Sequence, residues 1–174
     1  MKHPGNPVAL APAGAMLVLV ACGQAPDGGA AGPQGAANVD VESPEYAAME
    51  YRQGLMHVIA FKAGKLRDMA DGNIPVDEET FVEFAADLAA VAGMIEEGFL
   101  SGSDSEMLPG SNALPGIWAN WNDFLERAAT LHTAAQTVAS QAQSGGFQAA
   151  QAAASEQIGP ACGNCHREYR QRNE

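Results

Sequence analysis

The sequence predicts an all-α protein built as an antiparallel four-helix bundle. Alanine is used heavily and β-branched residues are few after the first 20 positions, which favours helix over sheet. Four stretches carry apolar residues at helical spacing, and each is bounded by residues that break helices. No stretch shows a strand pattern. Because the connections are short, consecutive helices should pack side by side in opposite directions.

The first two helices are expected at residues 44–70 and 77–98. Ser43 is a candidate N-cap with Pro44 in the first turn, and the second helix opens on an acidic turn that begins at Asp77. The apolar positions at helical spacing in these two stretches are Leu55, Met56, Ile59, Leu66, Met69, Phe81, Phe84, Leu88, Val91 and Ile95.

The third and fourth helices are expected at residues 115–143 and 147–172, with a stop at Ser144-Gly145-Gly146 between them. The loop at residues 99–112 is long for a bundle, which indicates a functional or site-covering role. Pro160 interrupts the fourth stretch, and proline inside a helix removes a hydrogen bond. Either the helix bends there, or a new helix begins with Pro160 in its first turn.

A Cys-x-x-Cys-His motif lies in the fourth stretch, at Cys162, Cys165 and His166. This spacing is typical of covalent haem c attachment, because each thiol can add to one vinyl group of the porphyrin. The imidazole then becomes an axial ligand of the iron. On a helix, Cys162 and His166 share one face. The sequence therefore predicts one haem c, with His166 as the iron ligand.

Three other interpretations of the two cysteines were weighed. A redox pair usually belongs to a chain of alternating strands and helices, which this sequence is not. A closed zinc site needs about four ligands, and no further thiols remain once Cys22 is assigned to the N-terminal segment. A structural disulfide has poor geometry at this spacing on a helix. The adjacent histidine favours haem.

The N-terminal segment, residues 1–21, is predicted to be a signal peptide. Its apolar run is short for a membrane span and ends in small residues. The sequence Leu-Val-Ala-Cys ending at Cys22 resembles the bacterial lipobox, which implies cleavage before Cys22 and a lipid on its sulfur; an ordinary signal peptide is the alternative. Residues 22–43 are rich in Gly, Ala and Pro and predict a flexible tether. The bundle then occupies residues 44–174, held to a membrane on the periplasmic side of a bacterium, where haem c is attached.

Charge and composition exclude several classes of function. The formal net charge is -12 and no basic stripe is present, so no nucleic-acid partner is expected. No nucleophile–base pair can be placed, so the sequence does not predict an enzyme. The basic residues are uneven, because Arg167, Arg170 and Arg172 crowd the C-terminus beside the haem motif.

Several separate motifs follow one another in residues 43–172. They are Tyr51-Arg52-Gln53 with Met56 one turn later, Gly64 and Gly72, Gly98-Phe99-x-x-Gly102-Ser103-Asp104, Leu114-Pro115-x-Ile117-Trp118, and Cys-x-x-Cys-His-x-x-Tyr-Arg at the end. With these motifs in this order, the chain resembles the cytochromes c′. The resemblance covers essentially the whole predicted bundle. It implies the four-helix fold, haem c and His166 as the proximal ligand.

The resemblance also implies roles for further residues. Arg52 and Gln53 match first-helix residues that contact the haem, Arg52 through a propionate. Arg170, one turn beyond His166, matches a proximal-side arginine that could bond a propionate or control access. Exposed helix surface is the alternative for Arg52 and Gln53. For Arg170 the alternative is a solvated C-terminal charge that the helix dipole favours. A homodimer through the first two helices is expected by the same resemblance.

Met56 falls where the family places the side chain that covers the distal face of the iron. In typical cytochromes c′ this residue does not ligate, and the iron is five-coordinate and high-spin. That implies electron transfer, binding of NO or CO, or both. The alternative is a low-spin electron carrier with Met56 as sixth ligand, and a third possibility is that Met56 only fills the core. His57 and His132 are expected to be surface or flank histidines rather than iron ligands.

Overall fold

The computed structural model describes residues 39–172. The predicted signal peptide, Cys22 and most of the predicted tether lie outside the described residues, so those assignments stay predictions. Within residues 39–172, no helix combines the length and apolar character needed to cross a membrane. The same part of the chain contains helices and one isolated bridge between two residues, and it has no strand. The predicted all-α class is confirmed.

The first helix, α1, spans Pro44–Ala70, as the sequence predicts. The Ser43 hydroxyl oxygen accepts a hydrogen bond from the Tyr46 amide at 3.1 Å, which caps the N-terminus. Pro44 occupies the first turn, where its missing N–H costs nothing. Buried side chains recur three or four residues apart along one face; they are Met49, Arg52, Leu55, Ile59, Ala63, Leu66 and Met69.

The second helix is shorter than predicted. α2 spans Glu78–Ala92, is capped by the Asp77 carboxylate, and is followed by a 3₁₀ turn, η1, at Ile95–Gly98. Gly93 is the C-cap, where the α-helical hydrogen bonds end. The hydrogen bonds of η1, which follows, have the tighter 3₁₀ pattern. The predicted single helix at 77–98 is therefore two elements.

The remaining helices differ from the prediction at their boundaries. A single turn, α3, spans Gly116–Ala119; α4 spans Trp121–Glu156; and α5 spans Ile158–Tyr169. Asn120 separates α3 from α4 with a non-helical backbone. The predicted stop at Gly145 and Gly146 appears as an interruption inside α4, where both glycines leave helical geometry and Gly146 has a φ of 66°.

Pro160 lies in the first turn of α5, where its missing N–H leaves no interior bond unmade. Of the two outcomes considered for this proline, a new helix rather than a bend is the one observed. α5 ends at Tyr169 and not at Arg172, because Arg170 has an extended backbone that pairs with Ala113.

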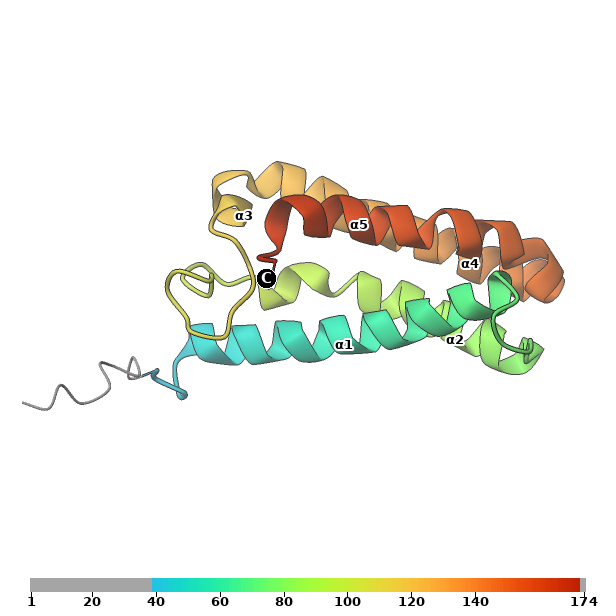
Figure 1. Cartoon of the computed structure of the whole chain (residues 1–174), viewed down its shortest axis with the longest axis horizontal. Helices are drawn as coiled ribbons and strands as arrows, with labels where there is room; N and C mark the ends of the chain where they lie inside the picture. The colour runs from blue at the N-terminus through green and yellow to red at the C-terminus, as the bar shows by residue number, and fades with distance from the viewer. Residues whose placement is uncertain (1–38, 173–174) are drawn as a thin grey trace, which may run out of the picture. The chain divides into compact units, whose positions relative to one another are not determined.

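Four helical arms form the bundle (Figure 1). They are α1, α2, the part of α4 before Gly145, and the part after Gly146 continued by α5. In Figure 1, α4 and α5 lie above α1 and α2. Fully buried side chains from all arms meet in one core, and the largest are Phe81, Phe124, Leu66, Leu88, Ile117, Ile158 and Val138. The predicted four-helix architecture is confirmed.

The loop between η1 and α3 is fixed to α1 by the guanidinium of Arg52. Arg52 is only 5% exposed. Its Nη1 donates to the Gly98 carbonyl at 2.7 Å and to Ser103 Oγ at 2.9 Å. Its Nη2 donates to the Ser103 carbonyl at 2.8 Å and to Ser111 Oγ at 3.0 Å. We call this arrangement the Arg52 clamp.

The end of the same loop is attached to the end of α5. The Leu114 amide donates to the Tyr169 carbonyl at 3.0 Å, and the Gln171 amide donates to the Asn112 carbonyl at 2.8 Å. Together with the Arg52 clamp, these bonds hold the loop between α1 and the C-terminal end of α5. The loop is therefore hydrogen-bonded to α1 on one side and to the end of α5 on the other.

Gly98 allows η1 to approach α1 closely, so we predict that Gly98→Ala destabilises the protein. An added Cβ would lie 2.8 Å from Arg52 Cβ and 3.0 Å from Arg52 Cα. Overpacking against backbone should lower the free energy of unfolding by about 1–3 kcal/mol, measured by urea unfolding of the haem-loaded protein. Gly54→Ala is the control: no atom lies within 4 Å of its Cβ position, and it should stabilise α1 by roughly 0.5–1 kcal/mol. Equal stability of wild type and Gly98→Ala would contradict this account.

We also predict that Arg52→Lys destabilises the bundle, although it keeps the charge. An ammonium group cannot reproduce a planar fork that reaches four acceptors, so buried carbonyls lose their partners. The free energy of unfolding should fall by about 2–4 kcal/mol. Arg67→Lys, at an exposed position of the same helix, should change it by less than about 0.5 kcal/mol. A similar effect of both substitutions in thermal unfolding would refute the clamp.

Candidate haem site

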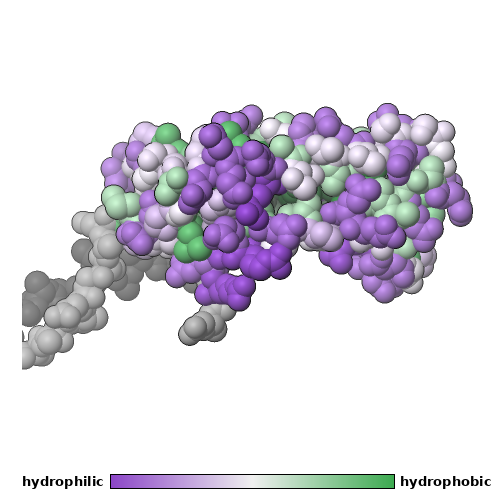
Figure 2. Space-filling model, turned by 90° about the horizontal axis from the view of Figure 1, so that it is seen from above, coloured by the Kyte–Doolittle hydropathy of each residue, from purple (hydrophilic) through white to green (hydrophobic). Residues whose placement is uncertain are grey.

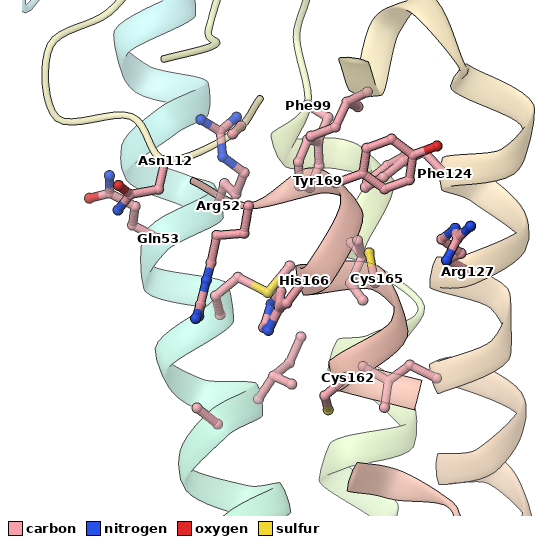
Figure 3. A pocket seen from close by; sticks show the side chains of 18 of the residues that line it. Arg52, Gln53, Phe99, Asn112, Phe124, Arg127, Cys162, Cys165, His166 and Tyr169 are labelled. Atoms are coloured by element: carbon pink, nitrogen blue, oxygen red, sulfur yellow. The ribbon is translucent and has the colours of Figure 1, made fainter. Parts of the chain in front are cut away.

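One cavity of about 440 Å³ lies among α1, the loop, α4 and α5. The structure places all seven side chains singled out for cofactor binding in its wall: Arg52, Gln53, Met56, Cys162, Cys165, His166 and Arg170. They come from opposite ends of the bundle sequence, and only the fold brings them together. Figure 3 shows His166 on the side of α5 that faces α1, whereas Cys165 lies on the side of the same helix nearer to Arg127 and Phe124. Their individual roles in binding stay predictions.

Burial shifts the pKa of each of the three motif residues on α5. Cys162 and Cys165 are both half-buried and unpaired, and burial raises the pKa of each thiol. Burial, followed by the nearby Arg170 charge, lowers the pKa of His166. At neutral pH the imidazole is therefore in its neutral form, which is the form that ligates metal.

A network that sequence reasoning missed fixes the haem-binding turn of α5 to α4. The Arg127 Nε pairs with Asp123 Oδ2 at 2.6 Å, and its Nη1 donates to the Asn164 carbonyl at 3.0 Å. Tyr169 donates its hydroxyl proton to the same aspartate, and burial with this contact raises the pKa of Tyr169 to about 12. Asp123 and Arg127 are four residues apart on α4, and that spacing was the available signal.

Aromatic rings close the cavity on the side of the loop and α4. The Phe99 and Phe124 ring centroids are 4.5 Å apart, and Phe124 meets Tyr169 edge-on at 5.8 Å. All three rings are buried and line the cavity. Such a wall excludes water and lowers the local dielectric constant, which strengthens electrostatic interactions inside.

On the α1 side, the polar donors are already engaged. Arg52 is committed to the Arg52 clamp, and Gln53 Nε2 donates to the Gly110 carbonyl at 2.9 Å. Next to them along the helix lie Met56, which is half-buried against the core, and Ile59. The part of α1 that faces the cavity beyond Gln53 is therefore mostly apolar.

The two other histidines lie apart from the centre of the site. His57 is exposed and lines the cavity from α1. His132 is half-buried on α4 and lies close to Gly93, away from the cavity lining. Neither placement resembles that of His166, whose ring comes from the helix that also carries both thiols.

The residues present fit a haem c. Two thiols and one neutral imidazole share a helix, an apolar interior is available, and arginines stand at its edge where carboxylates could be bound. The cavity volume lies within the range of about 300–1,000 Å³ found for small-molecule and cofactor sites. Residues 39–172 contain no cluster of three or more His, Cys, Asp or Glu placed to hold a metal ion.

Comparisons with known proteins agree with this geometry. The family model described as Cytochrome C' matches residues 47–170. Cytochrome c-554 of Cereibacter sphaeroides is 36% identical over 126 residues, which is 72% of this chain and 93% of that protein. Cytochrome c-556 of Agrobacterium tumefaciens (strain B2A) is 35% identical over 122 residues, covering 70% and 95%.

Solved structures give the same result for the fold. Cytochrome c prime from Shewanella frigidimarina superposes with a TM-score of 0.67 at 30% identity, covering 74% of this chain and 97% of that one. Cytochrome c' from Rhodobacter Spheriodes superposes with a TM-score of 0.68 at 24% identity, covering 75% and 100%. The chain belongs to the cytochrome c′ family, and its cofactor is covalently bound haem c.

Proposed function

We propose that this haem c protein is a periplasmic carrier of single electrons whose iron is five-coordinate, with His166 on one side and an open position beneath Met56 on the other. When bound, the haem supplies one-electron chemistry at iron and, at an open position, affinity for NO and CO. The protein residues bind the group, exclude water and select what reaches it. We propose no enzymatic turnover.

The observation that carries this proposal is the apolar character of the α1 wall. Arg52 makes four hydrogen bonds to the loop and Gln53 donates to the Gly110 carbonyl, and the residues of α1 that follow them in the cavity wall are mostly apolar. Bound dioxygen depends on hydrogen-bond donors in the distal pocket, whereas neutral NO and CO depend on them less. An apolar wall therefore favours NO and CO over dioxygen.

Some structures with this fold are described as nitric oxide complexes, of L16 mutants of cytochrome c prime from Alcaligenes xylosoxidans. One of them superposes with a TM-score of 0.65 at 22% identity, a likeness that concerns the fold alone. Binding of NO by the present chain thus rests on its own cavity wall.

A second candidate function is a closed, low-spin electron carrier in which Met56 is the sixth ligand. It is favoured by the placement of Met56, whose thioether is half-buried in the cavity wall on a flexible side chain. Among the residues of α1 that line the cavity, His57 is the one other sulfur or imidazole donor, and it is exposed. Methionine ligation raises the reduction potential of haem iron.

Met56→Leu separates the two candidates. If the position is open, ferric wild type is high-spin by absorption and EPR, and Met56→Leu leaves both the spin state and the binding of CO by the ferrous protein unchanged. His57→Leu is the matched control on the neighbouring residue and should also change neither. A low-spin wild-type spectrum that becomes high-spin only in Met56→Leu would overturn the open site and establish the closed one.

We further propose a homodimer formed through the outer face of α1 and its neighbour α2. Tyr51, Val58 and Phe61 are large apolar side chains exposed on α1, and Phe61 packs at 5.8 Å against Phe84 of α2. Phe61 is 56% exposed in the single chain. Phe61→Asp should convert a dimer to a monomer in analytical ultracentrifugation. Met107→Asp, at a 66% exposed residue of the loop, should leave the dimer intact; a monomeric wild type would refute the interface.

The cellular placement is a proposal that rests on the N-terminal sequence outside the described residues. We propose that Cys22 carries a lipid and tethers the bundle to a membrane on its periplasmic side. Cys22→Ser should then move the haem protein from the membrane fraction to the soluble periplasmic fraction after cell fractionation. Unchanged membrane association would contradict the anchor.

A further inference from the structure

The charges of this chain are strongly segregated. Residues 68–126 contain thirteen Asp and Glu and no Lys or Arg. This acidic segment forms all of α2, η1 and the loop, and its thirteen negative charges exceed the net charge of -12, because the rest of the chain has nine basic and eight acidic residues. A uniform surface of that charge would repel any anionic molecule that approaches the haem.

Five arginines nevertheless gather around α5, and we call them the arginine rim: Arg67, Arg127, Arg167, Arg170 and Arg172. Arg67 reaches from α1 to Gly159, where its Cζ lies 3.2 Å from the position of an added Cβ. Arg127 reaches from α4 to the Asn164 carbonyl at 3.0 Å. The other three belong to α5 or to the residues that follow it. Three different parts of the chain therefore direct positive charge to one helix.

The rim surrounds the cofactor residues. Among the charges that act on the motif side chains, Arg67 acts on Cys162, Arg127 on Cys165 and Arg170 on His166. Arg127 and Arg170 also line the cavity. Figure 2, which looks down on the side of α4 and α5, shows hydrophilic residues gathered on part of this face.

Most of the rim is available to a partner. Arg67, Arg167, Arg170 and Arg172 are exposed, and the ion pairs found within residues 39–172 do not involve them. Arg127 is half-buried and paired with Asp123, so its charge is largely compensated. Glu168 is the acidic residue within the C-terminal run from Arg167 to Arg172. The remaining local charge is positive.

We propose that the arginine rim is the docking surface for a redox protein that presents a carboxylate-rich patch. This inference rests on the electron-transfer function, and it names the class of partner. Arginine suits this role because its planar fork binds a carboxylate through two hydrogen bonds. The acidic α2 side repels the same partner. The segregated charges therefore orient this protein so that α5 faces the partner.

Oxidation of the ferrous haem-loaded protein by ferricyanide tests the proposal in stopped-flow experiments. One electron passes from ferrous haem to ferricyanide, giving ferric haem and ferrocyanide. The rate constant should fall as ionic strength rises from about 0.01 to 0.15 M, because the Debye length shrinks from about 30 to 8 Å. The cationic oxidant tris(phenanthroline)cobalt(III) should show a weaker or opposite dependence. A ferricyanide rate that rises with salt would mean that the total charge dominates, and would overturn the proposal.

Two single variants provide a matched comparison. Arg67→Gln removes a rim charge, and Lys65→Gln removes an exposed charge of the same helix about 200° around its axis. Arg67→Gln should lower the low-salt ferricyanide rate several-fold more than Lys65→Gln does. The triple arginine variant, Arg67→Gln/Arg167→Gln/Arg172→Gln, should lower this rate about tenfold or more. Equal effects of the two single variants would refute a local rim.

Carboxylates themselves are tested with immobilised poly-L-glutamate at low salt. Wild type and Lys65→Gln should be retained despite the negative net charge, and the triple arginine variant should elute in the void volume. Failure of wild type to bind would contradict the proposal. Absorption spectra of the same samples report the coordination state independently. A closed Met56 site would appear as a low-spin spectrum, whereas an inactive rim would appear as a loss of binding to poly-L-glutamate.

Discussion

The buried guanidinium of Arg52 is the interaction on which the arrangement of the site depends. Moving a charged group out of water costs several kcal/mol unless its hydrogen bonds are replaced. Burial lowers the pKa of Arg52 and the nearby Asp104 charge opposes that shift, but an arginine stays protonated in proteins. The loop must therefore close around the side chain. Its Phe99 ring also stacks beneath the cation, with Cζ 4.9 Å from the ring centroid.

Closure of the loop has consequences at the other end of the chain. Once Ser103 and Ser111 are held by Arg52, the following residues run beside α5 and pair with its end. That pairing ends α5 at Tyr169 and gives Arg170 an extended backbone, although its side chain still lines the cavity. One buried charge on α1 thus helps to define the position of the helix that carries the Cys-x-x-Cys-His motif.

The arm that ends in α5 is set apart from the first part of α4. Gly145 and Gly146 leave helical geometry and interrupt α4, α5 begins after Gln157, and Pro160 fits the first turn of α5. Arg127 and Tyr169 then fix α5 against α4 through Asp123. The His166 imidazole then lies on the side of α5 that faces α1, and the cavity between them is lined by Met56 and Ile59.

The sequence by itself determined the cofactor, the fold class and the starts of α1 and α2. Each of these conclusions rests on residues that are neighbours in the sequence. They are the Cys162-to-His166 motif, the apolar period of α1, its Ser43 cap, and the glycine stop at Gly145 and Gly146. The tertiary structure decided what these patterns left open. It engaged Arg52 with the loop, turned the end of the predicted second helix into a 3₁₀ segment, joined Asp123 to Tyr169, and gathered arginines from three parts of the chain around α5. Those outcomes depend on contacts between residues far apart in the sequence, such as Arg52 with Ser111, 59 positions away, and no local periodicity encodes them.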